Sequence, residues 1–290
     1  MQTSFETGEK SPAGTLQRLR QIRRRYVKKA GKRCIRRLGD FLGRQSLVGD
    51  HPVFDAATFP FLEPLERDWR LIRAECEAIL EAREHLPPFQ SISPDQAKIA
   101  IGDRWKTYIL YGFGYKSERN CARCPETTRL LETIPKLRSA WFSILSPGYH
   151  IPPHRGVTKG IVRGHLGLII PSERERCTMR VHDRVCTWKE GEFLVFDDTY
   201  DHEVLNDTDE ERTVLIVDFD RPMRIPGTVV SRAFLQGIRW TAYVQDARKN
   251  LNDWEDRFEA AVQRADAFHV DTDDAPGSTQ DVPKRDRPVQ

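Results

Sequence analysis

Short apolar runs with turn residues between them fill the middle of this chain, and they limit its fold more than any other feature. Runs that are rich in β-branched and aromatic residues and bounded by Gly, Pro, Asn and Asp are typical of β-strands. Strands are predicted at residues 140–146, 161–170, 177–182, 192–196 and 213–219, and a weaker one at residues 105–111. Many short strands in close succession predict a jelly roll or barrel.

Two histidines, His154 and His202, stand at the mouths of two such runs. Neutral imidazole binds divalent iron, copper, nickel and zinc. Each histidine precedes an arginine at a similar offset: Arg163 follows the first by nine residues and Arg212 follows the second by ten. The guanidinium fork matches a carboxylate through two hydrogen bonds, so two arginines can clamp a dicarboxylic acid. A metal beside a carboxylate anchor is what an iron oxygenase with a 2-oxo-acid co-substrate needs.

The segments around these residues resemble one protein family. In chain order they read PPHRGVTKG, VRGHLGLIIP, WKEGEFLVFDDTYDHEV and ERTVLIVDFDRP. They are similar to the aspartyl/asparaginyl β-hydroxylases, which are iron(II)- and 2-oxoglutarate-dependent dioxygenases. The likeness runs from about Trp105 to Pro222 and is strong from Ser143 onward. It implies a mainly β fold with flanking helices, the double-stranded β-helix barrel, with iron held at its open end.

The same resemblance implies a role for each matching residue. His154 and His202 would be the catalytic iron ligands, and Arg212 would bind the distal carboxylate of 2-oxoglutarate. The co-substrate pocket would be completed by Arg163, His165 and Ser143. Trp105 falls where the family often has a pocket tryptophan.

One ligand of the usual iron site is missing. Most non-haem iron oxygenases use two histidines and one carboxylate. The carboxylate would lie two residues after the first histidine, where this chain has Gly156. The family shares this departure, and a water is expected to fill the position. A histidine beside a strand is more often structural than a ligand, and we read His150 and His182 in that way. Asp201 precedes His202 directly, so on a strand the two side chains point to opposite faces.

Length and composition fit a single catalytic domain with appendages. The chain has 290 residues, of which 39% are hydrophobic and 31% are charged. No apolar run approaches the ~18 residues of a membrane span, and no signal peptide is visible. The expected location is the cytoplasm, with peripheral membrane contact as an addition. The six scattered cysteines predict free thiols. Cys121 and Cys124 have metal-site spacing, but no second pair accompanies them.

Positive charge is concentrated near the beginning of the chain. Residues 15–45 contain twelve Lys or Arg and a single acid, Asp40. Apolar residues recur in this segment at steps of three and four, which predicts an amphipathic helix. Such a helix can lie on an anionic membrane or can dock one apolar stripe onto the catalytic domain, and both alternatives stay open. No aromatic-rich motif accompanies the charge, which argues against nucleic acid as a partner.

These patterns divide the chain into four parts. Residues 1–14 are predicted to be disordered, residues 15–48 to form the basic amphipathic helical segment, residues 49–265 to form the dioxygenase domain and residues 266–290 to be a disordered tail. Residues 49–60 read as a linker with a turn. Helices are predicted over residues 63–83, from Pro125 onward, and between Pro222 and Val262.

The predicted reaction is hydroxylation of an unactivated C–H bond with Fe(II), 2-oxoglutarate and O2. The family's targets are Asp or Asn side chains and the acyl chains of lipid A. The lack of a membrane span favours the β-carbon of an Asp/Asn-type residue or amino acid. The basic helix favours the alternative, a lipid acyl chain. A reading from another class is a non-catalytic metal-binding barrel that acts as an interaction module.

Overall fold

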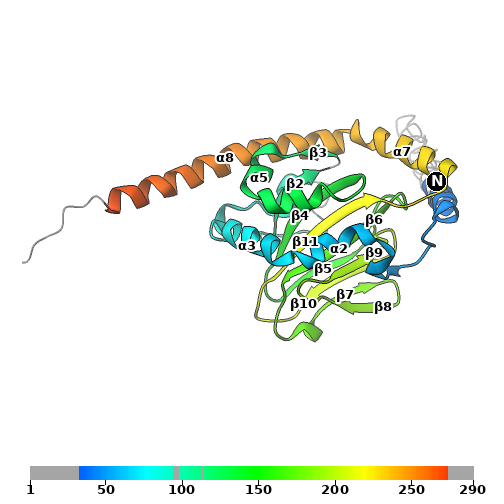
Figure 1. Cartoon of the computed structure of the whole chain (residues 1–290), viewed down its shortest axis with the longest axis horizontal. Coiled ribbons are helices and arrows are strands. Elements are labelled where there is room, and N and C mark those ends of the chain that lie inside the picture. The colour runs from blue at the N-terminus through cyan, green and yellow to red at the C-terminus, as the bar shows by residue number, and fades with distance from the viewer. Residues whose placement is uncertain (1–32, 94–97, 113, 274–290) are drawn as a thin grey trace, which may run out of the picture.

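The computed structural model describes residues 33–93, 98–112 and 114–273. Two antiparallel sheets face each other, and helices cover one of them and pass over one end of the barrel (Figure 1). The strand pairing is that of the predicted double-stranded β-helix with flanking helices. The fold class inferred from the sequence is therefore confirmed.

The large sheet has seven strands and carries most of the core. Their order across the sheet is β1-β9-β6-β11-β4-β2-β3. In that order their bounds are Val53–Phe54, Phe193–Phe196, Ile161–Ile169, Arg212–Asp220, Leu137–Leu145, Trp105–Gly112 and Tyr115–Lys116. The central strands agree with the predicted runs to within about three residues. These strands could be predicted from the sequence because they are long, nearly continuous runs of apolar residues.

The small sheet has four strands and was only partly predicted. Its order is β5 (Tyr149–His154), β10 (His202–Asn206), β7 (Cys177–Val181) and β8 (Arg184–Thr187). Of these, only β7 lies in a predicted run. Strand β5 was missed because it contains Pro152 and Pro153, which cannot donate to a ladder. Strands β8 and β10 are short and polar, so neither contains a clear apolar run.

Alternation along the central strands sorts side chains between two cores. On β4, Trp141 and Leu145 face the small sheet, whereas Phe142 and Ile144 face the helices. On β11, Val214 belongs to the inner core in the same way. Because successive strand residues point to opposite faces, the polar residues in register with the inner set also point into the barrel. This alternation builds the polar end of the barrel interior.

The helix predicted over residues 63–83 is divided in two. Helix α2 (Glu63–Arg67) ends at Asp68, and α3 (Trp69–Leu80) follows directly. Asp68 has φ −101° and ψ 19°, which breaks the helical geometry between them. Pro64 occupies the first turn of α2, as expected. Three short helices complete this layer: α4 (Phe89–Ile92), α5 (Glu118–Arg123) and α6 (Pro125–Leu131).

Two helices follow the last strand. Helix α7 (Ile225–Arg239) and the long helix α8 (Ala242–Asp273) pass across one end of the barrel (Figure 1). The tail was predicted to begin at Asp266, but α8 continues to Asp273 because no Gly or Pro interrupts the segment before Pro276. Of the helices in the described ranges, none has the length and apolar character needed to cross a membrane.

The segment that precedes the domain contacts it directly. Residues 33–45 are helical and bury Leu42, while the rest of the predicted basic helix and the predicted disordered segment of residues 1–14 lie outside the described residues. Residues 49–60 were read as a linker, but they contain β1, which pairs with β9, and a 3-10 turn at Ala56–Thr58. The linker reading is therefore corrected: this stretch is part of the large sheet's edge.

The six cysteines are free, as predicted. Cys121 and Cys124 are buried beside α5 and α6, and no group of three metal-ligating side chains occurs among the described residues. Cys186 lies across the β7–β8 hairpin from Met179, which is two residues further along β7 than Cys177.

Candidate active site

The two predicted metal ligands lie side by side in the small sheet. His154 ends β5 and His202 begins β10, and the register pairs the two residues directly. Their ring centroids are 4.1 Å apart. The Nδ1 atom of His154 donates to the carbonyl of Pro152 and that of His202 to the carbonyl of Tyr200, both over 2.9 Å. A carbonyl can only accept, so the proton sits on Nδ1 and the Nε2 lone pair is left for a metal.

Burial keeps both imidazoles neutral. It lowers the pKa of His154, and together with the neighbouring His154 it lowers the pKa of His202 to about 3. A metal requires the neutral form of the ring, so neither histidine has to lose a proton near neutral pH before it can bind. Donor type, tautomer and protonation therefore all fit a divalent transition metal such as iron.

Gly156, which stands where most non-haem iron oxygenases have a carboxylate ligand, packs against Asp198. A Cβ atom on Gly156 would overlap the carboxylate of Asp198. The Gly156 N–H also donates to the Asp198 carbonyl over 2.7 Å. Desolvation raises the pKa of Asp198 to about 6. A larger residue at position 156 would therefore have to displace a buried carboxylate, which explains why glycine is required here.

Arg212 is buried and lacks an ion-pair partner among the described residues. It is 1% exposed, and its Nε and Nη1 atoms have no hydrogen-bond partner within the described parts of the chain. The guanidinium carbon lies 4.8 Å from the centre of the Trp188 ring. Burial lowers the pKa of Arg212 to about 10, and the Cys177 thiol offsets only part of this effect. A buried cation without an anion is costly, so this geometry fits a carboxylate ligand.

His165, Trp105 and Ser143 line the same cavity as Arg212. Both ring nitrogens of His165 are buried without a hydrogen-bond partner among the described residues. Burial and the nearby Arg212 hold the pKa of His165 well below its usual range, so the ring is neutral. Trp105 donates through Nε1 to the hydroxyl of Ser143 over 3.0 Å. Polar atoms from three strands thus converge where the co-substrate was predicted to bind.

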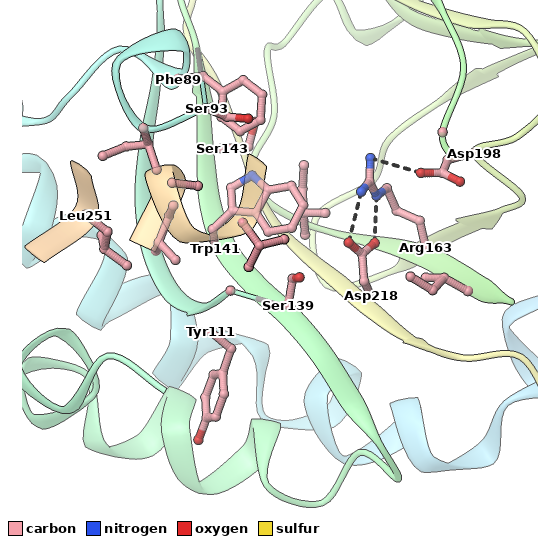
Figure 2. Close-up of a pocket in the computed structure, with 18 of the residues that line it drawn as sticks. Phe89, Ser93, Tyr111, Ser139, Trp141, Ser143, Arg163, Asp198, Asp218 and Leu251 are labelled. Carbon is pink, nitrogen blue, oxygen red and sulfur yellow. Dashed lines mark hydrogen bonds and ion pairs between the residues drawn. The ribbon is translucent and has the colours of Figure 1, made fainter. Parts of the chain in front are cut away.

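Arg163 lies on the cavity wall but is already bound to acidic side chains. It donates from Nε and Nη2 to Asp218 over 2.7 and 2.9 Å, and Nη1 lies 3.5 Å from Asp198 (Figure 2). Its guanidinium carbon is 5.2 Å from the ring centre of Trp141. Arg163 therefore positions Asp198 and Asp218, and any contact of Arg163 with the co-substrate stays a prediction.

The other histidines lie away from this cluster, where they were expected. His150 is exposed and its Nε2 atom is 2.8 Å from a Glu203 oxygen. His182 occupies a turn with φ 56°, and its ring lies 5.6 Å from that of Tyr200. Asp201 pairs with Arg180 on the outer side of the small sheet. None of these three residues lines the cavity that holds His154 and His202.

A single cavity joins all these groups. Its volume is about 440 Å³, within the usual range for ligand sites. It reaches from His165 and Arg212 past the paired histidines to an apolar portion under α4 and α8. We call this portion the apolar arm, and its apolar residues are Phe89, Ile92, Ile109, Trp141, Val244 and Leu251. Arg248, Asn252 and Glu255 of α8 line the cavity as well. In Figure 2, Leu251 lies on the opposite side of Trp141 from Arg163.

Sequence reasoning missed several residues of this site. Trp188 belongs to the WKEGEF motif, and its indole supports Arg212 and stacks near His165, with ring centroids 6.1 Å apart. Asp198 is one of several acids close to His202 in the sequence, and no motif distinguishes it from the others. Asp218 could have been found from strand pairing, because it is the register partner of Arg163. The apolar arm could not be found, because α4, β2, β4 and α8 are far apart in the sequence.

Comparison with known proteins places the chain in one class. A family profile described as aspartyl/asparaginyl beta-hydroxylase matches residues 66–222, which is more than half of the chain. The chain belongs to the aspartyl/asparaginyl β-hydroxylase family, as the sequence motifs indicated.

Individual relatives differ in the target that their names record. The chain is 44% identical over 216 residues to the ornithine lipid ester-linked acyl 2-hydroxylase of Rhizobium tropici, covering 74% of this chain and 77% of that protein. It is 35% identical over 170 residues to the human aspartyl/asparaginyl beta-hydroxylase, but spans only 22% of that protein. Human aspartate beta-hydroxylase domain-containing protein 2 is 31% identical over 55% of its length.

Solved structures give only a slight likeness. A cupin domain of a transcriptional regulator from Enterobacter cloacae has a TM-score of 0.28 at 14% identity and covers 40% of this chain. The fold assignment therefore depends on the strand order and pairing themselves.

Proposed function

We propose that this protein is an Fe(II)- and 2-oxoglutarate-dependent hydroxylase that acts on the acyl chain of a lipid. One observation carries the proposal: the same cavity contains a pair of neutral histidines, a buried arginine that has no ion pair with the described residues, and an apolar arm. The family supports hydroxylation as the reaction. The three parts of the cavity match the three things that have to bind, which are the metal, the co-substrate and a saturated chain.

His154 and His202 would hold the iron through Nε2, since their Nδ1 atoms are committed to backbone carbonyls. Iron would supply the oxidation of 2-oxoglutarate and the activation of O2 when bound. Arg212 would fix the distal carboxylate through its Nε and Nη1 donors, in the two-pronged geometry that guanidinium groups favour. His154 and His202 would be two protein ligands rather than three, which would leave room at the metal for co-substrate, oxygen and water.

His165 and Ser143 would orient the bound co-substrate. The His165 nitrogens are buried and unpaired within the described chain, so a ligand that accepts one N–H bond would remove part of their desolvation cost. The Ser143 hydroxyl already receives the Trp105 indole N–H, which leaves its own proton for the ligand. These residues bind and orient; they do not exchange protons, because His165 is held neutral.

The apolar arm is the reason to prefer an acyl chain over the Asp/Asn-type target. An aspartyl substrate brings a carboxylate that needs a cation, yet the two arginines that flank His154 are occupied. Arg155 lies 3.5 Å from Asp201, and Arg163 is bound to Asp218. By contrast, each methylene that leaves water for an apolar wall contributes about 0.8 kcal/mol. The Rhizobium relative, named for an acyl target, supports the same choice.

The Asp/Asn-type substrate stays the alternative, supported by the human relative's name. A non-catalytic barrel is the weaker reading, because the chain keeps both histidines and Arg212 in one cavity. The apolar arm would also shield the reacting carbon from water, which limits uncoupled oxidation of the co-substrate.

The test is a coupled assay with purified protein, Fe(II), ascorbate and 2-oxoglutarate. We expect succinate release that rises when a detergent-dispersed acyl lipid such as an ornithine lipid is added, together with a sixteen-dalton gain on its acyl chain. His202→Ala should remove both signals, and the exposed His150→Ala should keep them. A gain on Asp or Asn peptides and none on lipid would reverse the choice of substrate.

A further inference from the structure

The outer face of α7 exposes large apolar side chains at helical spacing. Ile225, Val229 and Trp240 are 81%, 60% and 75% exposed. Steps of four, and then eleven, residues place the three on one side of the helix together with Ala233. The opposite side, with Gly227, Ser231 and Leu235, is buried against the rest of the protein. The solvent-exposed side of α7 is therefore partly apolar as well.

Arginines surround this apolar face. Arg224 precedes the first turn of α7, and Arg232 lies at the edge of the face; both are exposed. The helix of residues 33–45 abuts the same turn: the Arg224 N–H donates to the Gln45 carbonyl, and the Arg224 Nη1 donates to the Arg44 carbonyl, both over 2.9 Å. Figure 1 shows this helix, in blue, beside α7.

That neighbouring helix adds more positive charge and more exposed apolar surface. Its exposed arginines, none of which forms an ion pair within the described ranges, are Arg33, Arg36, Arg37 and Arg44. Ile35 and Leu47 are 54% and 62% exposed beside them. Asp40 is the one acid in this stretch. The combined surface therefore has the composition of an interfacial helix pair, in which aliphatic and Trp side chains insert and arginines bind phosphate.

One opening of the cavity lies at a loop that contacts the buried side of α7. The loop of residues 155–160 follows His154 and packs under α7, where a Cβ atom on Gly160 would overlap the Ser231 hydroxyl. In this loop, Val157 both lines the cavity and is 62% exposed, so the cavity meets solvent there. Val244 and Ala247, just past the end of α7, line the cavity as well. A membrane on the exposed side of α7 would be separated from this opening by the width of that helix.

We propose that the exposed side of α7 and the helix of residues 33–45 form a docking face for a bilayer that contains anionic phospholipid. Ile225, Val229 and Trp240 would enter the interfacial region, and the arginines would bind lipid phosphates. A second copy of the chain fits less well, because a two-fold contact would bring two sets of arginines together. Only the consequence for catalysis, entry of an acyl chain directly from the bilayer, rests on the proposed function.

Vesicle co-sedimentation of the full chain tests the docking face. The vesicles are equal parts phosphatidylglycerol and phosphatidylcholine, compared with phosphatidylcholine alone. We expect the wild type to sediment with the anionic vesicles and to be released by high salt. The triple variant Ile225→Ser, Val229→Ser, Trp240→Ser should bind at least about tenfold more weakly, since each side chain contributes apolar burial. Loss of three arginines in Arg33→Gln, Arg36→Gln, Arg37→Gln should weaken binding mainly at low salt.

The matched control removes exposed apolar side chains elsewhere on the protein. Val185 and Ile101 are 70% and 72% exposed, and neither belongs to the docking face. Val185→Ser with Ile101→Ser should bind vesicles as the wild type does. All variants should melt at the wild-type temperature, because the replaced side chains are on the surface. Equal vesicle binding by the triple variant and this control would overturn the proposal. A wild-type dimer that the triple variant disrupts, without vesicle binding, would overturn it in favour of self-association.

An activity measurement separates this proposal from the proposed function. On detergent-dispersed lipid the triple variant should keep the wild-type rate, whereas on vesicles its rate should fall with its binding. Vesicle binding without lipid hydroxylation would uphold the docking face and contradict the proposed substrate. Hydroxylation of dispersed lipid without vesicle binding would uphold the proposed substrate and contradict the docking face.

Discussion

Replacing Arg212 by methionine should stabilise the ligand-free protein. Burial lowers the pKa of Arg212 from its ordinary value to about 10. At about 1.4 kcal/mol per pKa unit, the buried charge costs roughly 3 kcal/mol. Because the folded-state pKa lies below the ordinary value, this cost is fully present below about pH 10, including at pH 7. Arg212→Met removes the charge and keeps much of the volume, so the free energy of unfolding should rise by about 1–3 kcal/mol.

The same variant should lose its response to the co-substrate. Thermal melting, with manganese in place of iron to prevent turnover, measures both effects. Each kcal/mol corresponds to about 2–4 °C in a domain of this size. In the wild type, 2-oxoglutarate at a hundred times its dissociation constant should add about 2.7 kcal/mol of stability, and in Arg212→Met it should add almost none.

Arg163→Met is the matched control, because Arg163 is a cavity arginine with acidic partners. Its loss leaves Asp218 buried without its cation and should destabilise the protein by about 3–5 kcal/mol. The reasoning is refuted if Arg212→Met is destabilised like Arg163→Met. It is refuted as well if Arg212→Met is still stabilised by 2-oxoglutarate as the wild type is.

Three further results are expected. His202→Ala should lose metal binding, measured by isothermal titration with Mn(II), whereas His150→Ala should bind as the wild type does; the reverse would exchange the ligand assignment. Leu251→Asp should raise KM for the lipid at least tenfold but leave lipid-independent succinate release unchanged, because it places a charge in the apolar arm. Asp198→Asn should raise stability at pH 7.5 and lose this advantage below about pH 6, where the wild-type carboxyl is protonated; a constant difference would contradict the raised pKa.

The barrel was readable from the sequence because burial on both faces produces continuous apolar strands. Strands β4, β6 and β11 are of this kind, and the residues they aim inward follow from alternation alone. Strand β5 was not readable, since Pro152 and Pro153 cannot donate to the ladder and His150 and His154 interrupt its apolar pattern. His154, which is predicted to bind metal, thus lies in a strand with a weak sequence signal.

Ordered motifs singled out His154, His202 and Arg212, but they did not give the charge states or the ion-pair partners of the side chains around them. Whether Arg163 or Arg212 is free for a carboxylate depends on Asp218 and Asp198, and only the fold brings these acids to Arg163. The apolar arm depends on α8, which lies more than a hundred residues from β2 in the sequence. The sequence motifs therefore predict which polar side chains line the cavity, whereas the apolar arm depends on packing between segments that are distant in the sequence.

Oxygen labelling tests the central claim most directly. The protein is supplied with Fe(II), 2-oxoglutarate and an acyl lipid under ¹⁸O₂, and succinate and lipid are analysed by mass spectrometry. The account predicts one labelled oxygen in succinate and one in the hydroxyl group of the acyl chain, in equal amounts, and neither in His154→Ala. Label in succinate alone, with an unmodified acyl chain, or a hydroxyl group that carries oxygen from water, would contradict it.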